Sequence, residues 1–242
     1  MKNFKSYSNE ALVRLSEDSS VANTLEIDEL NITEKEELIE GKINLTQERI
    51  EWVSEKIKLL GGQKIVDLGC GEGKLISHLM KDSFFKYITG ADVSIHSLSR
   101  ARKKLNIDNL PSFQKNRVNL MQTALTYRDQ RLAGYDVATL IEVIEHVDLP
   151  RLDSLKRVVF EFAKPSFVII TTPNAEYNSL FENLPIGQFR HNDHRFEWTR
   201  EEFRIWAEDI AKKFGYNVTF EDIGTKHEIL GSPTQAGVFI QK

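Results

Sequence analysis

The alternation of short apolar segments with helical patterns constrains the fold of this chain more than any other feature. Helical periodicity is expected at residues 46–60, 73–80, 94–105, 149–164 and 199–215. Between and after these patterns, strands are expected at residues 64–68, 87–93, 117–125, 135–143, 166–173, 216–223 and 235–242. Such alternation predicts an α/β fold, a doubly wound and mainly parallel seven-stranded sheet, and the last two strands predict a C-terminal antiparallel hairpin.

Local stop and start signals mark several of these helices. Gly61 and Gly62 end the first pattern, Ser94 precedes another, and Thr199 with Glu202 forms a capping box at the start of the last. Residues 1–45 are acidic and lack clear strand alternation. We expect them to form an N-terminal extension or linker, or one or two flanking helices, before a domain at residues 46–242.

The composition excludes several classes of protein. A chain of 242 residues suffices for one large α/β domain with an extension. It has no apolar run long enough to cross a membrane, its start lacks a signal peptide, and its single cysteine excludes an internal disulfide. These features predict a cytoplasmic protein without a membrane partner. With a net charge of −4, any contact with nucleic acid must be local.

A glycine-rich loop follows the first predicted strand in the segment VDLGCGEGKL. A dinucleotide fingerprint requires glycine where this chain has Lys74, so that class is disfavoured. The pattern is instead Asp67 followed by alternating glycines, and the second strand ends in Asp92, whose carboxylate could accept both hydroxyls of a ribose. Ligands of such sheets bind beyond the carboxyl ends of the strands, so this loop predicts a nucleoside-containing cofactor.

A second cluster of polar residues follows the predicted strand at 135–143. Glu142, Glu145 and His146 would share one face if a helical turn begins there. Two carboxylates held together raise each other's pKa unless a cation compensates them, so a divalent metal is expected. A fourth ligand could come from either His191 or His194, in the long stretch before the capped helix. The alternative is that this cluster is the solvated start of an ordinary helix.

Together, the segments DLGCGEG and GADVS resemble the first two motifs of class I S-adenosylmethionine-dependent methyltransferases. Three further segments, EVIEHV, TTPNAEYN and FRHNDHRFEWTREEF, resemble the HUA-enhancer type of small-RNA methyltransferase over residues 46–241. Enzymes of that type methylate the 2′-hydroxyl of the 3′-terminal nucleotide of an RNA. The resemblance implies that this chain does the same, with S-adenosylmethionine and a divalent metal, Mn²⁺ or Mg²⁺, as cofactors.

The resemblance also assigns roles to residues. It implies that the cofactor is bound by Asp67, Gly69, Gly71, Gly73, Asp92, Thr123, Ala124 and Ile141. It implies that the metal is bound by Glu142, Glu145, His146 and His194. Imidazole with carboxylate suits Mn²⁺ better than Mg²⁺, which prefers oxygen and water.

The acceptor chemistry implied by the family uses the vicinal hydroxyls of a terminal ribose. An RNA with free 2′ and 3′ hydroxyls is therefore expected as the partner, and a 3′ phosphate should be rejected. His191, His146 or a metal-bound hydroxyl could accept the proton. The expected RNA contacts are Arg190 and Arg195 to phosphate, and Tyr177 or Phe196 to the last base; surface charge and core packing are the respective alternatives.

Bacterial members of this family work with a polynucleotide kinase-phosphatase in RNA repair, behind a separate N-terminal half. The domain content here is similar to that branch, so a kinase-phosphatase/ligase partner is expected. Two other functions stay open. One is a metal-dependent O-methyltransferase of a small molecule with vicinal hydroxyls, and the other is a non-catalytic binding module.

Overall fold

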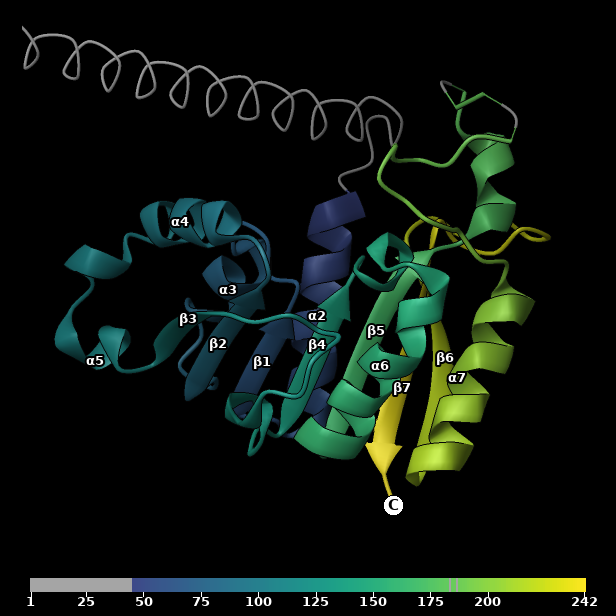
Figure 1. The fold of residues 1–242 in the computed structure, drawn as a ribbon. Coiled ribbons are helices and arrows are strands. Elements are labelled where there is room, and N and C mark those ends of the chain that lie inside the picture. Colours follow the sequence, from purple (N-terminus) through teal and green to yellow (C-terminus); the bar gives the residue numbers. More distant parts are fainter. Residues whose placement is uncertain (1–44, 183, 186) are drawn as a thin grey trace, which may run out of the picture.

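The computed structural model describes residues 45–182, 184, 185 and 187–242, which form one α/β unit around a seven-stranded sheet (Figure 1). The strands are β1 (Lys64–Leu68), β2 (Tyr87–Asp92), β3 (Val118–Gln122), β4 (Val137–Ile141), β5 (Phe167–Pro173), β6 (Tyr216–Ile223) and β7 (Thr234–Gln241). The prediction for residues 1–45 lies outside the described residues except for Leu45, which begins the first described helix.

The strand order, β3-β2-β1-β4-β5-β7-β6, confirms the doubly wound, mainly parallel sheet. Every pair from β3 to β5 is parallel, whereas β7 is antiparallel to both of its neighbours, β5 and β6. In Figure 1 the arrow of β7 therefore points toward the labelled C-terminus, opposite to β5. The predicted C-terminal hairpin is confirmed, and its last strand lies inside the sheet.

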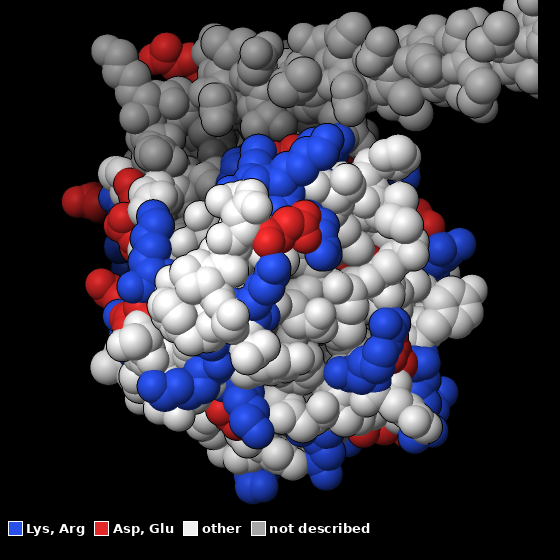
Figure 2. Space-filling view, turned by 90° about the vertical axis from the view of Figure 1, so that its left-hand side faces the viewer, with Lys and Arg blue, Asp and Glu red and all other residues white. Residues whose placement is uncertain are grey.

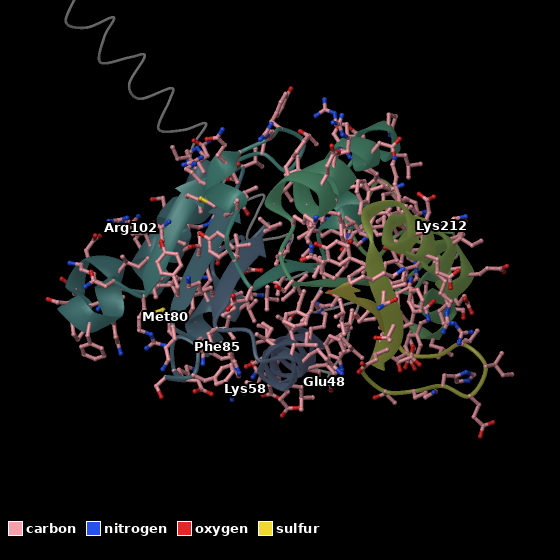
Figure 3. The ribbon with its side chains drawn as sticks, turned by 90° about the horizontal axis from the view of Figure 1, so that it is seen from below. Glu48, Lys58, Met80, Phe85, Arg102 and Lys212 are labelled. Atoms are coloured by element: carbon pink, nitrogen blue, oxygen red, sulfur yellow. The ribbon has the colours of Figure 1, made fainter. Side chains whose placement is uncertain are left out.

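Helices cover both faces of the sheet. They are α2 (Leu45–Leu60), α3 (Lys74–Leu79), α4 (Ile95–Lys104), α5 (Ser112–Lys115), α6 (Leu152–Lys156) and α7 (Arg200–Phe214). Neighbouring residues of one strand point to opposite faces, so Ile65 packs with α2 to α4 and Val66 packs with α6 and α7. Seen from below, Glu48 and Lys58 of α2 lie on one side of the sheet and Lys212 of α7 on the other (Figure 3).

The predicted helix boundaries are confirmed where capping signals exist. Ser94 accepts a hydrogen bond from the Ser97 amide at the start of α4, and Thr199 forms the predicted capping box with Glu202 at the start of α7. Gly215 ends α7 in the left-handed conformation. These local signals were sufficient because each acts within one turn of backbone.

The expected single helix at residues 149–164 is wrong in its winding. The segment contains the 3-10 turn η4 (Leu149–Arg151), the short helix α6 and a wider π-helical run, η5 (Arg157–Ala163). Three consecutive residues, Val158, Val159 and Phe160, are all buried, although α-helical spacing would spread them over a wide arc. We attribute the wider winding to the burial of these three adjacent apolar side chains in the same core.

The winding of the sheet reverses between β1 and β4, which lie side by side. The carboxyl ends of these strands are therefore the expected ligand site. The segment 174–198 between β5 and α7, which we call the histidine insert, lies at this end of the sheet (Figure 1). Within the described ranges, the model contains no helix that is both long and apolar enough for a membrane span.

Candidate active site

The glycine loop after β1 is a tight turn whose middle glycine, Gly71, faces open space. Gly69, Gly71 and Gly73 all have positive φ, at 78°, 52° and 80°, which favours glycine at each position. A Cβ added at Gly69 would meet Val143 at 2.6 Å, whereas one added at Gly71 would meet no atom within 4 Å. The loop therefore packs tightly at its first glycine and leaves its middle accessible to a ligand.

Two carboxylates flank this loop. Asp92, at the end of β2, accepts hydrogen bonds of 2.8 Å from the amides of Gly71 and Ser94, which fix the carboxylate beside the loop. Asp67 is buried and accepts a hydrogen bond from the Thr139 hydroxyl at 2.8 Å. Burial, together with the charge of Asp92, raises the pKa of Asp67 to about 7, although the Thr139 hydrogen bond opposes this shift. A nearby cation would offset the cost of ionising this buried carboxyl, so Asp67 suits a cationic partner.

The remaining predicted cofactor residues lie along the same edge of the sheet. The Thr123 amide donates to the Asp92 carbonyl at 3.0 Å, and the Thr123 hydroxyl donates to Asp129 at 2.9 Å. Ala124 follows directly, whereas Ile141 ends β4, which β1 and β2 separate from β3 in the sheet, and it is half-buried against the core. The expected adenine side is therefore contiguous with the expected ribose side.

Glu142 differs from the sequence expectation in its backbone. Its φ is +52°, which is rare for a non-glycine residue, so it lies outside the following 3-10 turn, η3 (Ile144–His146). The expected helical face shared by residues 142, 145 and 146 is therefore wrong. The Glu142 carboxylate is instead bound by Arg49 of α2 at 2.8 Å and by the Thr171 hydroxyl at 2.8 Å.

Glu145 is fully buried, at 0% exposure, behind Glu142. Its Oε2 accepts a hydrogen bond from the Thr172 hydroxyl at 2.9 Å, while its Oε1 has no hydrogen-bond partner among the described residues. Burial and the nearby charge of Glu142 raise the pKa of Glu145 well above its ordinary value. A buried carboxylate with one unsatisfied oxygen is costly unless a cation or a proton compensates it.

Three histidines meet next to these carboxylates. One ligand nitrogen from each of His146, His191 and His194 lies within 4.8 Å of the others. Burial, followed by the charges that His194 and His191 can bear, lowers the pKa of His146 to about 4, so His146 is neutral near pH 7. Neutral imidazoles are metal ligands, and this is the one such group of three or more metal-binding side chains within the described residues.

The histidine insert is anchored by a buried polar network. Arg190, only 4% exposed, donates from Nη2 to the Asn174 carbonyl at 2.7 Å and from Nε to the Asn178 side-chain oxygen at 2.7 Å. Its amide donates to Glu197 at 2.7 Å. Glu197 in turn bonds the Nδ1 of His194 at 2.6 Å. The insert therefore has a fixed conformation around His194.

His191 has a different environment. Its Nδ1 accepts a hydrogen bond from the Asp193 amide at 3.0 Å. A neutral imidazole has one proton and one lone pair, so this bond leaves the proton on Nε2. In this conformation the Nε2 of neutral His191 is a hydrogen-bond donor, which fits neither a metal ligand nor a proton acceptor at that nitrogen. The two candidate histidines are thus distinguished by their hydrogen-bond partners.

A family model described as a methyltransferase domain matches residues 43–219. The crystal structure of the methyltransferase domain of bacterial CtHen1-CN is 51% identical, with a TM-score of 0.76, and the match covers 81% of this chain and 100% of that one. The chain belongs to the Hen1 family of methyltransferases. S-adenosylmethionine is accordingly its cofactor.

Relatives in the Hen1 family include proteins named small RNA 2′-O-methyltransferase. The Gallus gallus protein is 35% identical over 205 residues, which are 82% of this chain and 54% of that protein. The Mus musculus protein is 37% identical over 212 residues, which are 84% of this chain and 53% of that protein. The chain therefore spans about half the length of the curated relatives it matches.

The predicted RNA contacts have unequal positions in this Hen1 domain. Arg190 is buried and bonded within the insert, so it organises the loop rather than presenting a free phosphate contact. Arg195 has a half-exposed side chain 3.6 Å from Asp148. Tyr177 and Phe196 are both buried, Tyr177 packing edge-on against Phe181 and Phe196 against Trp198. Both rings therefore pack in the protein interior, which is the alternative to stacking on an RNA base.

Several residues of the site were not anticipated from the sequence. Arg49 shares the four-residue spacing of the buried Val53 and Ile57 on α2, and this spacing was the available sign that its side chain points inward. Glu197 follows His194 by three positions, within reach of its imidazole. The partners of the carboxylates, Thr139, Thr171 and Thr172, had no distinguishing pattern, because their role depends on strand pairing.

The surface around α4 and the edge strand β3 has both basic and acidic side chains. Figure 2 shows the face that includes α4 and the β3 edge, with basic side chains in several separate groups and acidic side chains among them. Arg100 of α4 pairs with Glu72 of the glycine loop at 2.7 Å, and Lys104 binds the same carboxylate. Basic residues on this face therefore support the loop, and they do not form one continuous positive surface.

Proposed function

We propose that this domain transfers a methyl group from S-adenosylmethionine to the 2′-hydroxyl of the 3′-terminal nucleotide of an RNA. The observation that supports this most is the position of the three histidines, the buried Glu145 and the partly buried Glu142, at the reversal point of a Hen1-family sheet beside the cofactor loop. The relatives named small RNA 2′-O-methyltransferase support the same acceptor.

The side chains present fit a divalent cation. Glu145 Oε1 is buried without a partner among the described residues. The ligand atoms that lie within 4.8 Å of one another belong to His146, His191 and His194, and the charge of Glu142 acts on His146. We propose Glu142, Glu145, His146 and His194 as the residues that would bind it, with Mn²⁺ preferred to Mg²⁺. When bound, the cation supplies Lewis-acid polarisation of the ribose hydroxyls. Arg49 neutralises Glu142 in the cation-free protein and would have to share that carboxylate.

The other residues bind, orient and manage protons. Asp67 fits the cationic amino-acid end of the cofactor, and Asp92 fits its ribose. His146, whose pKa is lowered to about 4, is neutral near pH 7 and has a nitrogen lone pair for a proton or a cation. The Nε2 proton of His191 suits donation to an oxygen of the RNA. Arg195 is the exposed arginine of the insert and suits a phosphate.

The test is methyl transfer from labelled S-adenosylmethionine to a short RNA, with and without Mn²⁺. Transfer is expected to RNA with free terminal hydroxyls and not to its DNA counterpart, to a 2′-deoxy end or to a 3′-phosphate end. Equal labelling of a 3′-phosphate end would refute the terminal-hydroxyl model. Transfer to a catechol in preference to RNA would favour the small-molecule alternative, and no transfer to either would favour a binding module.

We also propose that the whole protein acts in RNA repair with a polynucleotide kinase-phosphatase and a ligase. A solved Pnkp1/Rnl/Hen1 RNA repair complex contains a chain with this fold, 23% identical with a TM-score of 0.59, a likeness that bears on the fold alone. The support for this proposal is therefore membership of the Hen1 family. Co-purification of the full-length protein with both enzymes is the expected result, and a full-length protein that binds neither would refute it.

A further inference from the structure

The buried carboxylate of Glu197 is the part of the histidine insert that the proposed reaction does not itself use. The Glu197 side chain is 0% exposed, and its hydrogen-bond partners among the described residues are Asn178, Arg190 and His194, none of which is proposed to bind the cofactor. A fully buried carboxylate next to a proposed metal ligand calls for a physical reason, because burial of an ionised group is costly without compensation.

Compensation comes entirely from donors within the insert. Oε1 accepts from the Arg190 amide at 2.7 Å and bonds His194 Nδ1 at 2.6 Å, and Oε2 accepts from the Asn178 side-chain amide at 2.5 Å. Both oxygens of Glu197 thus accept from N–H donors, of Arg190 and of Asn178. Glu197 is therefore the acceptor toward His194 as well, and His194 donates from Nδ1.

The second nitrogen of His194 follows from this bond. Once Nδ1 bears the proton, the lone pair of neutral His194 lies on Nε2, the nitrogen left for a ligand. His191, in the same cluster, has the opposite arrangement, because its Nδ1 accepts the Asp193 amide. Two adjacent imidazoles thus have different tautomers, each fixed by one hydrogen bond.

We propose that Glu197 is a positioning residue that fixes the Nδ1-protonated tautomer and the ring orientation of His194, so that Nε2 can bind a divalent cation. This inference rests on the proposed function, because it gives the cation site one of its ligands. It deepens that function by explaining why His194 rather than His191 is the ligand. Carboxylate partners of this kind orient metal-binding histidines and increase their basicity.

Asn178 and Arg190 extend the same arrangement. Asn178 donates to Glu197 and accepts from Arg190 Nε, so the amide orientation of Asn178 is fixed from both sides. Arg190 is in turn bonded to the Asn174 carbonyl at the end of β5. The network therefore ties the orientation of His194 to the rigid sheet.

The direct test reads the tautomers in the metal-free protein. Nitrogen–proton NMR correlations of labelled histidine, recorded at mildly alkaline pH where imidazoles are neutral, should show His194 protonated at Nδ1 and His191 at Nε2. Resonances are assigned with His194→Ala and His191→Ala. A wild-type His194 protonated at Nε2 overturns the proposal without any variant having to fold.

The second readout is metal affinity in Glu197→Gln, whose neutral amide no longer requires a donor at Nδ1. We expect Mn²⁺ affinity to fall about 10–100-fold, with His194 shifted toward the Nε2-protonated tautomer and S-adenosylmethionine affinity unchanged. Glu176→Gln is the matched control, since Glu176 pairs with Arg200 at 2.6 Å at the base of the same insert and contacts none of the histidines. This control should retain wild-type values of both quantities.

Asn178→Ala gives a milder perturbation if Glu197→Gln does not fold, and it should reduce Mn²⁺ affinity by less than Glu197→Gln. Unchanged Mn²⁺ affinity in Glu197→Gln, or in Asn178→Ala if only that variant folds, overturns the positioning role. Failure of the wild-type protein itself to bind Mn²⁺ would instead refute the proposed cation site. The cation half of this inference would fall with it, while the NMR spectra would still decide the tautomer assignment.

Discussion

The cofactor loop and the histidine site lie at the same end of the sheet but are built in different ways. The loop and its two carboxylates come from residues 67–94, one continuous stretch in which Asp92 accepts two backbone amides. The histidine site joins η3 to an insert some fifty residues later, and it leaves Glu145 Oε1 unsatisfied among the described residues. Both oxygens of Asp92 in the first site are therefore hydrogen-bonded, whereas Glu145 Oε1 in the second has no hydrogen-bond partner among the described residues.

This difference implies that the two sites should fail independently. The loop depends on glycine conformations and on Asp92, none of which contacts the histidines among the described residues. The histidine site depends on side chains from separate segments, so removal of one ligand should empty it. Variants that weaken binding at one site and leave the other unchanged would support this independence, and variants that weaken binding at both sites would contradict it.

The largest expected effect is that of His194→Ala. Mn²⁺ binding and methyl transfer should both be lost, with affinity reduced by more than about 100-fold, because Glu142, Glu145 and His146 then lack the fourth proposed ligand. S-adenosylmethionine should still bind through the loop. Metal titration and cofactor titration of the same variant measure the two effects separately.

His191→Ala is the paired control, and it should retain the metal whatever its effect on rate. Mn²⁺ retained by His194→Ala but lost by His191→Ala would reverse the assignment of the ligand. Retention of Mn²⁺ by both variants would remove the histidine insert from the metal site.

Glu145→Gln should separate stability from binding. The pKa of Glu145 is raised, chiefly by burial and then by Glu142, so ionisation in the folded protein costs stability that is intact at low pH and lost as pH rises. The variant should therefore be more stable than the wild type at alkaline pH and equal to it in acid. Its Mn²⁺ affinity should fall. Denaturant unfolding without metal checks the first expectation, and lower stability at alkaline pH would contradict it.

Asp92→Ala tests the cofactor side. Loss of a charged acceptor for the ribose should weaken S-adenosylmethionine binding by ~1.5–3 kcal/mol, while Mn²⁺ affinity stays unchanged. Because Asp92 also accepts the amides of Gly71 and Ser94, some of this loss would reflect a looser loop. Calorimetry that finds unaltered cofactor affinity would show that the assignment of β2 is incorrect.

The smallest expected effect is a pH dependence of cofactor binding in the metal-free protein. Burial raises the pKa of Asp67 to about 7, and only its ionised form attracts a cationic ammonium group. Affinity should therefore fall as pH decreases through about 7, by at most about tenfold per pH unit. Asp67→Asn should bind more weakly and without this dependence. A pH-independent wild type would place the ammonium group elsewhere.

Much of the fold was predictable because its determinants are local. The apolar runs predicted the seven strands, and the capping box at Thr199 and the serine cap at Ser94 predicted where two helices begin. The winding of residues 149–164 was not predictable in this way. It depends on how three consecutive buried residues fit a core that other segments complete.

The cofactor loop could be derived from the sequence, because its glycine pattern directly follows a strand and Asp92, which ends the next strand, bonds backbone amides of the loop and of its own turn. Only the tertiary structure decided how the second site is assembled. The left-handed Glu142 bound by Arg49, the buried Glu145 beside Thr172, and the opposite tautomers of His191 and His194 all depend on the packing of the insert and on strand pairing. A hydrogen bond between distant segments leaves no periodic trace in a sequence, and here such bonds determine which nitrogen and which oxygen remain available.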